Sequence, residues 1–468
     1  MEKVNVKIRS RKILADIITP VSIFLKIRDL YPGSVLLESS DYHNLHGAFS
    51  FIGMDLLSEF RVENRMISVN MPFGETKEIQ PESNTKVIDY LSDYIASFVV
   101  SGSSDERMID GVFGYISYDA VELFEDIDLT AAANSQSTIP VIRYGFFRYI
   151  IAINHLKNEM HVFENIVDGA ESNLDTVVSL LQSRNIATYG FSVQGEEQSN
   201  MTDDEYMQIV ARGKEHCFRG DVFQIVLSRQ FSQKFRGDEF NVYRTLRSIN
   251  PSPYLFYFDY GSYKLFGSSP EAQIEIKKGK AYINPIAGTF RRTGDDAQDQ
   301  ELAKKLAGDD KENAEHIMLV DLARNDLSRT TLKVTVERYR EIQFYSHVIH
   351  MVSKVSGELK PGVNTIRILA ESFPAGTLSG APKFRAMELI DRYEGTRRGF
   401  YGGTIGNIRF NGEINTAIMI RSFMSRDNTL FYQAGAGVVS ESSETGEKNE
   451  VNNKLAALKS AVEMAGLI

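Results

Sequence analysis

A short segment of the chain, residues 310–329, carries five carboxylates around an apolar run. Glu315 and Asp321 flank residues 317–320, which are apolar on every side of a helix and therefore predict a buried helix. An ionised carboxylate is costly to bury alone, so such groups require a metal ion, an arginine or backbone donors. The segment is a candidate either for a metal site or for a structural network with Arg324 and Arg329.

A second acidic segment lies near the end of the sequence, where Glu444, Glu447 and Glu450 precede Lys454. Mg²⁺ prefers hard oxygen ligands and keeps several of its waters, so one or two protein carboxylates suffice to bind it. Two acidic segments on separate helices would supply them. At this point a magnesium site and a structural ion network are equally good interpretations.

Two glycine-containing motifs could bind anions. Residues 373–383 lack the spacing of a phosphate-binding loop, and Pro382 removes a backbone donor, so we do not expect a nucleotide site. Residues 434–437 follow a predicted strand but lack the third glycine of a dinucleotide fingerprint. They predict instead a close approach of bare backbone N–H groups to a small anion.

The one cysteine, Cys217, lies beside His216 within a predicted helix. A nucleophilic thiol needs an exposed turn and an activating base, so we expect Cys217 to be a buried apolar residue. A single cysteine also excludes an internal disulfide and a thiolate metal cluster.

The composition is that of an ordinary globular protein, with 43% hydrophobic and 24% charged residues in a chain of 468. This length predicts more than one lobe. The net charge is −10 without any basic block, which argues against nucleic-acid binding. The sequence shows neither an apolar run near the ~20 residues of a membrane span nor a signal-peptide pattern. We therefore expect a cytoplasmic protein that binds neither nucleic acid nor membrane.

The elements that must position these groups can be predicted from the hydrophobic pattern. In the first part, helices are expected at residues 20–30, 87–98 and 174–183, and strands at residues 34–39, 47–53 and 141–154. Residues 195–200 are polar and without periodicity, which predicts a linker. Thr202 and Glu205 then form a capping box that opens the next helix.

The second part mixes strands and helices without regular alternation. Helices are expected at residues 297–307, 311–328, 364–372 and 382–392 and from about 447 onward. Strands are expected at residues 223–228, 254–259, 264–268, 272–277, 281–285, 403–410, 414–424 and 429–438. This pattern predicts an α+β fold with a two-lobed β-sandwich core flanked by helices. The predicted linker separates an N-terminal region, residues 1–193, from a second region, residues 200–468.

A series of blocks in the second region resembles the chorismate-utilising enzymes, and within them the large components of anthranilate synthases. The blocks are DVFQIVLSR (221–229), NPSPYL (250–255), GSSPE (267–271), PIAGT (285–289), EHIMLVDLARND (315–326), FPAGTLSGAPK (373–383), QAGAG (433–437) and EKNEVNNK (447–454). So many spaced blocks in one order make the resemblance specific. LLES (36–39) and FSFIG (49–53) extend it more loosely into the N-terminal region.

The resemblance implies a site for chorismate and Mg²⁺. Glu315 and Glu450 match the ligands of the metal, which holds the ring carboxylate of chorismate. Arg421 offers a forked partner for the enolpyruvyl carboxylate, and the glycines offer backbone donors. The positions that match substrate contacts are Gly288, Thr289, Tyr401, Arg421, Gly435, Ala436 and Gly437.

The resemblance also implies catalytic roles. Glu271, His350 and Thr377 match positions around the leaving hydroxyl and the elimination step. Glu271 is the expected general acid, provided that burial keeps part of it protonated near neutral pH. The metal would act as a Lewis acid. Asp321, Arg324 and Asp326 are then interpreted as a network that supports the helix of Glu315.

Two positions select a reaction within the family. Relatives that add water place a lysine base where this chain has Gln224, which cannot deprotonate water. Relatives that make aminodeoxychorismate typically carry a lysine nucleophile where this chain has Ala287. The remaining reaction is direct attack of ammonia on the ring, loss of the 4-hydroxyl, and release of pyruvate to give anthranilate.

Two kinds of partner follow from the resemblance. Because the lone cysteine is not in a tight turn, ammonia is expected from a separate glutamine amidotransferase subunit in a heteromer, with a heterotetramer as one possible form. Tryptophan is expected as a feedback inhibitor, bound between lobes by Ser39, Pro253, Tyr254 and Leu255. The alternative for those four residues is an ordinary strand and turn.

Two other functions are kept open. One is an aminodeoxychorismate synthase large subunit, with the same fold and a different product. The other is a catalytically silent amino-acid sensor that keeps the pocket at residues 36–39. The sensor is disfavoured because it has no need of Glu315, Glu450, Arg421 and the glycines at 435 and 437.

Overall fold

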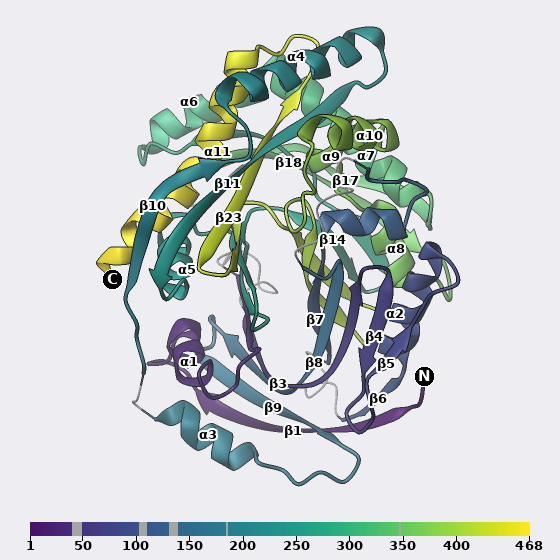
Figure 1. Ribbon diagram of the computed structural model, residues 1–468, viewed down its shortest axis with the longest axis vertical. Coiled ribbons are helices and arrows are strands. Elements are labelled where there is room, and N and C mark those ends of the chain that lie inside the picture. Colours follow the sequence, from purple (N-terminus) through teal and green to yellow (C-terminus); the bar gives the residue numbers. More distant parts are fainter. Residues whose placement is uncertain (40–48, 103–109, 131–138, 184–185, 346–347) are drawn as a thin grey trace.

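The computed structural model describes residues 1–39, 49–102, 110–130, 139–183, 186–345 and 348–468. Figure 1 shows most of the helices on the outside of a strongly curved system of strands. No helix within these described ranges is long and apolar enough to cross a membrane. The helices are α1 (Pro20–Ile27), α2 (Val87–Ala96), α3 (Leu174–Gln182), α4 (Asp203–Arg219), α5 (Phe240–Ile249), α6 (Asp296–Ala307), α7 (Asp310–Ser328), α8 (Thr365–Ser372), α9 (Gly376–Ser379), α10 (Lys383–Glu394) and α11 (Glu444–Met464).

The strands of the N-terminal region form a mostly antiparallel sheet. Its neighbours pair in the order β6, β1, β9, β8 and β3, and β3 also pairs with β2 and β4. The pairing of β1 with β6 is parallel. The strands are β1 (Val4–Leu14), β2 (Val35–Glu38), β3 (Phe49–Glu63), β4 (Met66–Asn70), β5 (Lys77–Ile79), β6 (Phe98–Ser101), β7 (Gly111–Ile116), β8 (Ile142–Asn154) and β9 (Glu159–Val167).

The strands of the second region continue the same hydrogen-bonded system. One run pairs β10, β11, β23, β22, β13 and β12 in order, and another joins β20, β21, β14, β15, β18 and β17. The strands are β10 (Phe191–Ser199), β11 (Gln224–Gly237), β12 (Tyr254–Asp259), β13 (Lys264–Ser269), β14 (Ala272–Lys277), β15 (Lys280–Ile283), β16 (Ile286–Arg291), β17 (Thr331–Phe344), β18 (Val348–Leu359), β19 (Gly380–Ala381), β20 (Thr404–Arg409), β21 (Ile414–Ile418), β22 (Ser422–Arg426) and β23 (Thr429–Val438).

Besides β10, whose first three residues belong to the N-terminal region, two strand pairings within the described residues join the two regions. β2 pairs with β12, with Glu38 opposite Leu255, and β7 pairs with β20, with Gly114 opposite Gly406. Both junctions are antiparallel and lie within the sheet. The N-terminal strands are therefore continuous with those that carry the blocks described above.

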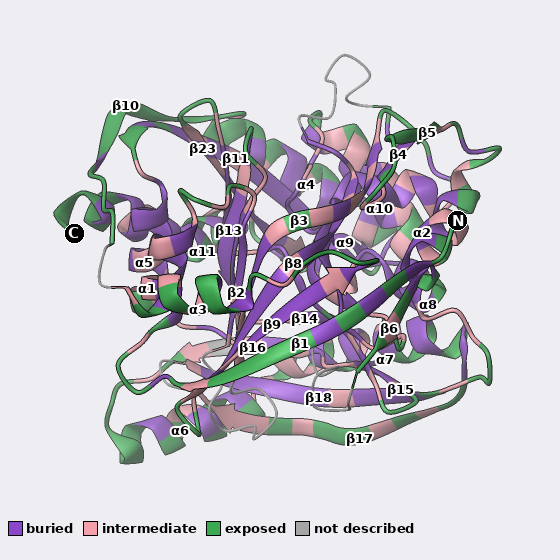
Figure 2. Cartoon of the chain, turned by 90° about the horizontal axis from the view of Figure 1, so that it is seen from below, coloured by how far each residue is buried: buried purple, intermediate pink, exposed green. Residues whose placement is uncertain are grey.

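Local sequence explains several of these elements. Thr202 caps α4 through the expected capping box with Glu205, and Gly220 ends the helix in the left-handed conformation, with φ of 77°. Strand β1 alternates buried and exposed residues at its start, as a strand covered on one face does. Figure 2 shows β1 as mostly exposed with buried residues near its start, whereas the residues of β14 are largely buried.

The expected α+β class is confirmed, but the expected linker is wrong. Residues 195–199 belong to β10, which pairs with β11 from Phe191 to Ser199 with an irregularity between Gln194 and Gln198. Their side chains are exposed, so the strand is held by backbone hydrogen bonds rather than by an apolar face. The three largest clusters of buried hydrophobic side chains each contain residues from before 193 and after 200.

The apolar run in α7 is also only partly buried. Leu319 and Val320 are buried, but Ile317 is 42% exposed. The helix therefore packs along one side instead of being enclosed.

Candidate active site

The end of β23 forms the centre of the candidate site. Gly435 lies opposite Ser228 and Gly437 opposite Val226 in the pairing of β23 with β11. A Cβ atom on Gly435 would lie 2.8 Å from the carbonyl oxygen of Leu227, and one on Gly437 would lie 2.3 Å from Nε2 of Gln224. Glycine is required here because the protein's own atoms approach the strand this closely.

Carboxylates reach this strand from two helices. Nε2 of Gln224, beside Gly437, donates a hydrogen bond of 3.3 Å to Oε1 of Glu315 on α7. On α11, Nζ of Lys454 lies 2.7 Å from Oε1 of Glu450 and donates to the carbonyl oxygen of Gly435 at 2.9 Å. Glu315 and Glu450 are thus linked, through one intermediate side chain each, to neighbouring positions of β23.

The link through Lys454 was not predicted from the sequence. Its signal is the spacing of Glu450 and Lys454, four residues apart on one helix face, which favours an ion pair. The hydrogen bond of Gln224 to Glu315 was not predicted either, because it joins residues 91 positions apart.

The two predicted metal ligands suit Mg²⁺ by their chemistry. Both are carboxylates, and both side chains are only partly buried, so waters and a substrate oxygen could complete the shell of such a cation. Within the described residues there is no group of three or more His, Cys, Asp or Glu side chains placed to hold a metal. A metal at this site would depend on ligands from outside the protein.

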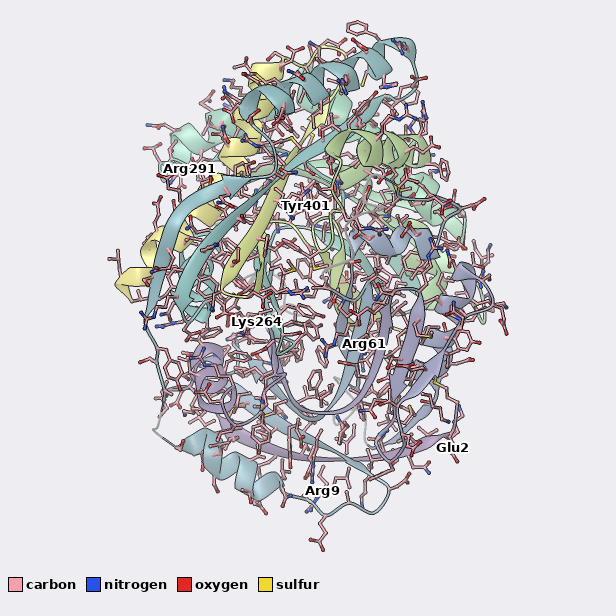
Figure 3. All side chains as sticks on the ribbon, in the orientation of Figure 1. Glu2, Arg9, Arg61, Lys264, Arg291 and Tyr401 are labelled. Atoms are coloured by element: carbon pink, nitrogen blue, oxygen red, sulfur yellow. The ribbon has the colours of Figure 1, made fainter. Side chains whose placement is uncertain are left out.

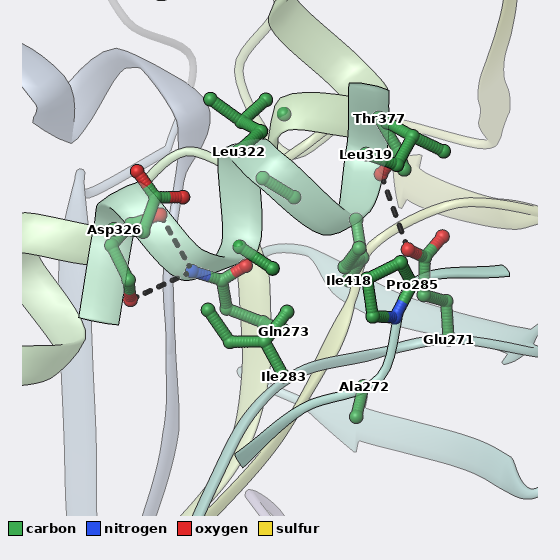
Figure 4. Close-up of a pocket in the computed structure, with 14 residues that line it drawn as sticks. Glu271, Ala272, Gln273, Ile283, Pro285, Leu319, Leu322, Asp326, Thr377 and Ile418 are labelled. Atoms are coloured by element: carbon green, nitrogen blue, oxygen red, sulfur yellow. Dashed lines mark hydrogen bonds between the residues drawn. The ribbon is translucent and has the colours of Figure 1, made fainter. Parts of the chain in front are cut away.

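Glu271 lies beside Thr377 and directly precedes β14 in the sequence. Oγ1 of Thr377 donates to Oε1 of Glu271 at 3.3 Å, as Figure 4 shows. Burial raises the pKa of the Glu271 carboxyl to about 8, although this hydrogen bond and the positive charges of Lys454 and Arg421 act in the opposite direction. The condition for a general acid is met, because about half or more of this group is protonated up to that pH.

His350 on β18 lies beside the Gly288 backbone. Its Nδ1 is 3.0 Å from the carbonyl oxygen of Gly288, which fixes the hydrogen on Nδ1 and leaves Nε2 as the acceptor nitrogen. Burial lowers the pKa of His350 below its usual value, against the hydrogen bond to Gly288, which raises it, and the charge of Arg421 also lowers it. Gly288 has φ of 67°, and a Cβ there would lie 2.5 Å from Cδ1 of Leu306. Thr289 pairs with His350 in the sheet, and its side chain lies outside what the structure describes.

Arg421 and Tyr401 are the remaining predicted substrate-binding residues of the candidate site. Arg421 adopts a left-handed φ of 48° just before β22. Burial lowers the pKa of its guanidinium, partly offset by the charge of Glu271. Tyr401 is 3% exposed, and Figure 3 shows it in the interior, far from rim residues such as Glu2 and Arg9. Burial raises the pKa of Tyr401 well above its usual value, although a hydrogen bond with the backbone at Gly435 lowers it.

A small cavity of about 30 Å³ lies behind Glu271 and Thr377, large enough for about one water molecule (Figure 4). On its far side Nε2 of Gln273 donates to the carbonyl oxygen and to Oγ of Ser372, each at 3.3 Å. Its other lining residues are Ala272, Ile283, Pro285, Leu319, Leu322, Ala323, Asp326, Ala375, Gly376 and Ile418.

The predicted support network of α7 is not one network. Arg324 pairs with Asp321 at 2.7 Å, but both side chains are more than half exposed. Asp326 is buried and pairs instead with Lys383 of α10 at 2.9 Å. Of these three residues, Asp326 alone anchors the helix in the interior, because an exposed pair adds little.

The four predicted effector residues come from adjacent segments. In the pairing of β2 with β12, Glu38 lies opposite Leu255, so the chain at Ser39 runs beside the chain at Tyr254 and Pro253. Glu38 is buried, accepts hydrogen bonds from Tyr243 at 3.0 Å and from Arg247 at 2.5 Å, and has its pKa raised by burial. The structure brings the segments together; the binding of an effector there remains a prediction.

Comparison with known proteins agrees with this architecture. The model of the chorismate binding enzyme family matches residues 58–460. Anthranilate synthase component 1 of Aquifex aeolicus is 36% identical over 490 aligned positions, which cover 99% of this chain and 96% of that protein. Its counterpart from Neisseria gonorrhoeae is 36% identical over 469, covering 97% and 94%.

Solved structures give the same result. Anthranilate synthase component I from Streptococcus pneumoniae superposes with a TM-score of 0.77 at 29% identity, covering 95% of this chain and 99% of that one. MenF, the menaquinone-specific isochorismate synthase from Escherichia coli, has a TM-score of 0.74 at 18% identity, covers 99% and 96%, and shares the fold. The chain belongs to the chorismate-binding enzymes and is an enzyme that acts on chorismate. Within that family its full-length relatives above are anthranilate synthase component 1 proteins.

Proposed function

We propose that this protein is the chorismate-converting subunit of an anthranilate synthase, a lyase that forms anthranilate and pyruvate from chorismate and ammonia. The observation that carries the proposal is the placement of Glu271, whose Oε1 accepts a hydrogen bond of 3.3 Å from Oγ1 of Thr377. Its pKa of about 8 places a protonated carboxyl beside Thr377 and within the field of Arg421, as a reaction that expels a hydroxyl group requires. The full-length similarity to anthranilate synthase component 1 supports the same conclusion.

The substrate would be bound by charge and by backbone donors. The guanidinium of Arg421 forms a forked pair with the enolpyruvyl carboxylate, and backbone N–H groups at residues 435–437 and at Gly288 bind the other polar edges. Tyr401 closes the interior side. When held by Glu315 and Glu450, Mg²⁺ would supply a Lewis acid that draws electron density towards the ring carboxylate.

Two side chains favour ammonia as the nucleophile, because one cannot act as a base and the other cannot act as a nucleophile. Gln224 cannot take a proton from water, and Ala287 carries no amine, whereas ammonia needs no base to attack the ring. Glu271 donates its proton to the 4-hydroxyl, which leaves as water. Nε2 of the neutral His350 imidazole then takes the proton from the ring carbon that carries the new amino group. The bond from the ring to the enolpyruvyl oxygen breaks as the ring becomes aromatic, and the enolpyruvate released gains a proton at its methylene carbon to become pyruvate.

The ammonia would come from a glutamine amidotransferase subunit. Such a subunit needs a reactive thiolate, and burial raises the pKa of Cys217, the one cysteine of this chain, to about 11. Its Sγ lies 3.5 Å from the carbonyl oxygen of Val438, and the residue is partly buried rather than fully buried as expected. The chain alone is therefore expected to use ammonium salts and not glutamine.

One assay tests the proposal. The purified chain is incubated with chorismate, Mg²⁺ and excess ammonium, and anthranilate fluorescence and pyruvate are followed. We expect both products to form at equal rates, with EDTA and the replacement of ammonium by glutamine as negative controls. Accumulation of aminodeoxychorismate without fluorescence would identify the alternative synthase, and the absence of any turnover would favour a silent sensor.

Regulation by tryptophan is tested at Ser39. We propose that Ser39 binds the amino-acid head group while Pro253, Tyr254 and Leu255 form the wall near the indole. Ser39→Ala should raise the tryptophan concentration for half inhibition by about tenfold, because a hydrogen bond to a charged group is lost. Ser262→Ala, at the other end of the β12–β13 hairpin and exposed, is the matched control. An unchanged inhibition curve for Ser39→Ala refutes the pocket.

A further inference from the structure

Strand β11 has a gap along one of its edges. On one side it pairs continuously with β23 from Ile225 to Lys234. On the other side β19 pairs with Gln224 and Ile225, and β10 pairs from Phe231 onward. In the described chain no strand pairs with residues 226–230 on that side. Buried backbone groups in such a gap need other partners.

A buried ion pair fills this gap. Glu394 ends α10 and Arg398 follows four residues later, with N–O distances of 2.6 and 2.9 Å and side chains that are 2% and 1% exposed. The backbone N–H and Oγ of Ser228 both donate to Oε1 of Glu394 at 2.7 Å. Nη2 of Arg398 donates to the carbonyl oxygen of Val226 at 2.8 Å. The two side chains replace the missing strand.

The same pair touches three walls of the candidate site. Val226 and Ser228 lie directly opposite Gly437 and Gly435 in the sheet. Nη1 of Arg398 donates to the carbonyl oxygen of Leu378, the residue after Thr377, at 2.5 Å. The guanidinium carbon also lies 5.6 Å from the ring centroid of Tyr401. Of these contacts, only the one with the ring of Tyr401 involves a side chain that we propose to touch the substrate.

We propose that Glu394 and Arg398 are positioning residues for chorismate: they fix β11 beneath the glycines of β23 and hold Tyr401 and the Thr377 turn against it. This rests on chorismate being the substrate, as proposed above. The fork of Arg398 is essential, because it holds Glu394 and two carbonyl oxygens in fixed directions at once. A lysine keeps the charge but has one nitrogen, so it cannot hold all three.

The test is Arg398→Lys, compared with Arg28→Lys. Arg28 forms another forked pair in the interior, with Asp238 at 3.0 and 2.6 Å and side-chain exposures of 9% and 11%. Asp238 follows the Gly237 end of β11, whereas Gly435 and Gly437 pair with the opposite end of that strand. We expect Arg398→Lys to raise the chorismate KM and the chorismate Kd in calorimetry by about tenfold. Arg28→Lys should lower Tm comparably and leave both constants unchanged.

A milder variant keeps the proposal testable if Arg398→Lys does not fold. Ser228→Ala removes one donor to Glu394, together with the acceptor of a hydrogen bond from Nε2 of Gln433 on β23, and leaves the backbone N–H in place, so the chorismate Kd should rise about fivefold. A folded Arg398→Lys, or Ser228→Ala, with unaltered chorismate Kd and KM overturns the positioning role. Equal changes in Arg28→Lys overturn it too. A wild-type chain that binds chorismate without forming anthranilate contradicts the proposed function instead, and the calorimetric comparison still decides the positioning role.

Discussion

Glu271→Gln should lower kcat for anthranilate formation by about 10²- to 10⁴-fold, the usual contribution of a positioned general acid. The amide keeps the size of the side chain and can still accept the hydrogen bond from Thr377. It has no proton to give to the leaving 4-hydroxyl. The measurement is the steady-state rate of fluorescence increase at saturating chorismate, Mg²⁺ and ammonium.

The pH dependence gives this prediction a second readout. Because the pKa of Glu271 is raised to about 8, the acid form is present below that pH and is lost as the pH rises through it. With rates referred to free NH₃, kcat/KM of the wild type should fall above about pH 8, and the residual rate of Glu271→Gln should not. Glu275→Gln, on β14 and paired with Lys277, is the control and should behave as wild type. Wild-type kcat in Glu271→Gln removes Glu271 from the mechanism.

Glu315→Gln should reduce Mg²⁺-dependent turnover by about 100-fold or more, because a charged oxygen ligand is replaced by a neutral one at a hard cation. The amide oxygen can still accept from Nε2 of Gln224, so the fold should be retained. In a titration with Mg²⁺, half-maximal activity should be reached at a higher Mg²⁺ concentration than in the wild type. Calorimetric binding of Mg²⁺ in the presence of chorismate should weaken in parallel.

The matched control for this variant is Asp321→Asn. Asp321 lies on the same helix, α7, but its side chain is 64% exposed and pairs only with Arg324 among the contacts described above. Neutralising it changes the net charge of α7 by the same amount without touching β23. Equal loss of Mg²⁺ dependence in both variants would mean that the charge of the helix, and not Glu315 as a ligand, is what matters.

Sequence patterns predicted elements that have a local signal. Strands at residues 254–259, 272–277 and 429–438 match β12, β14 and β23 to the residue, because each combines apolar or β-branched residues with flanking turn residues. Strands β1, β17 and β18 were not predicted. In β17 most side chains are partly or fully exposed, so its pattern lacks the buried face that alternation reveals. In β1 the alternation of buried and exposed residues covers only residues 4–8, and the rest of the strand is mostly exposed, so its pattern is also weak.

Some residues of the candidate site could likewise be predicted from the sequence, whereas others could not. Residues within motif blocks, such as Glu271 and Thr377, could be named from the sequence, and the structure places them 3.3 Å apart. The roles of Lys454, Glu394 and Arg398 could not be predicted. Each depends on which strand edge or carbonyl lies beside it, and that is decided by pairings between segments about 20 to 170 residues apart. Tertiary packing, and not local preference, determines such contacts.

The junctions of β2 with β12 and of β7 with β20 limit how this enzyme can change during evolution or engineering. Removing residues 1–193 would not release a simpler, unregulated catalyst. It would strip two strands from their neighbours and leave open sheet edges that pair with other chains, a route to aggregation. Relief from the inhibition that we propose at Ser39 would therefore have to come from single substitutions that spare the backbone pairing. In the part of the chain that the structure describes, the N-terminal strands are therefore continuous with the second region and do not form a separate module for grafting onto another enzyme.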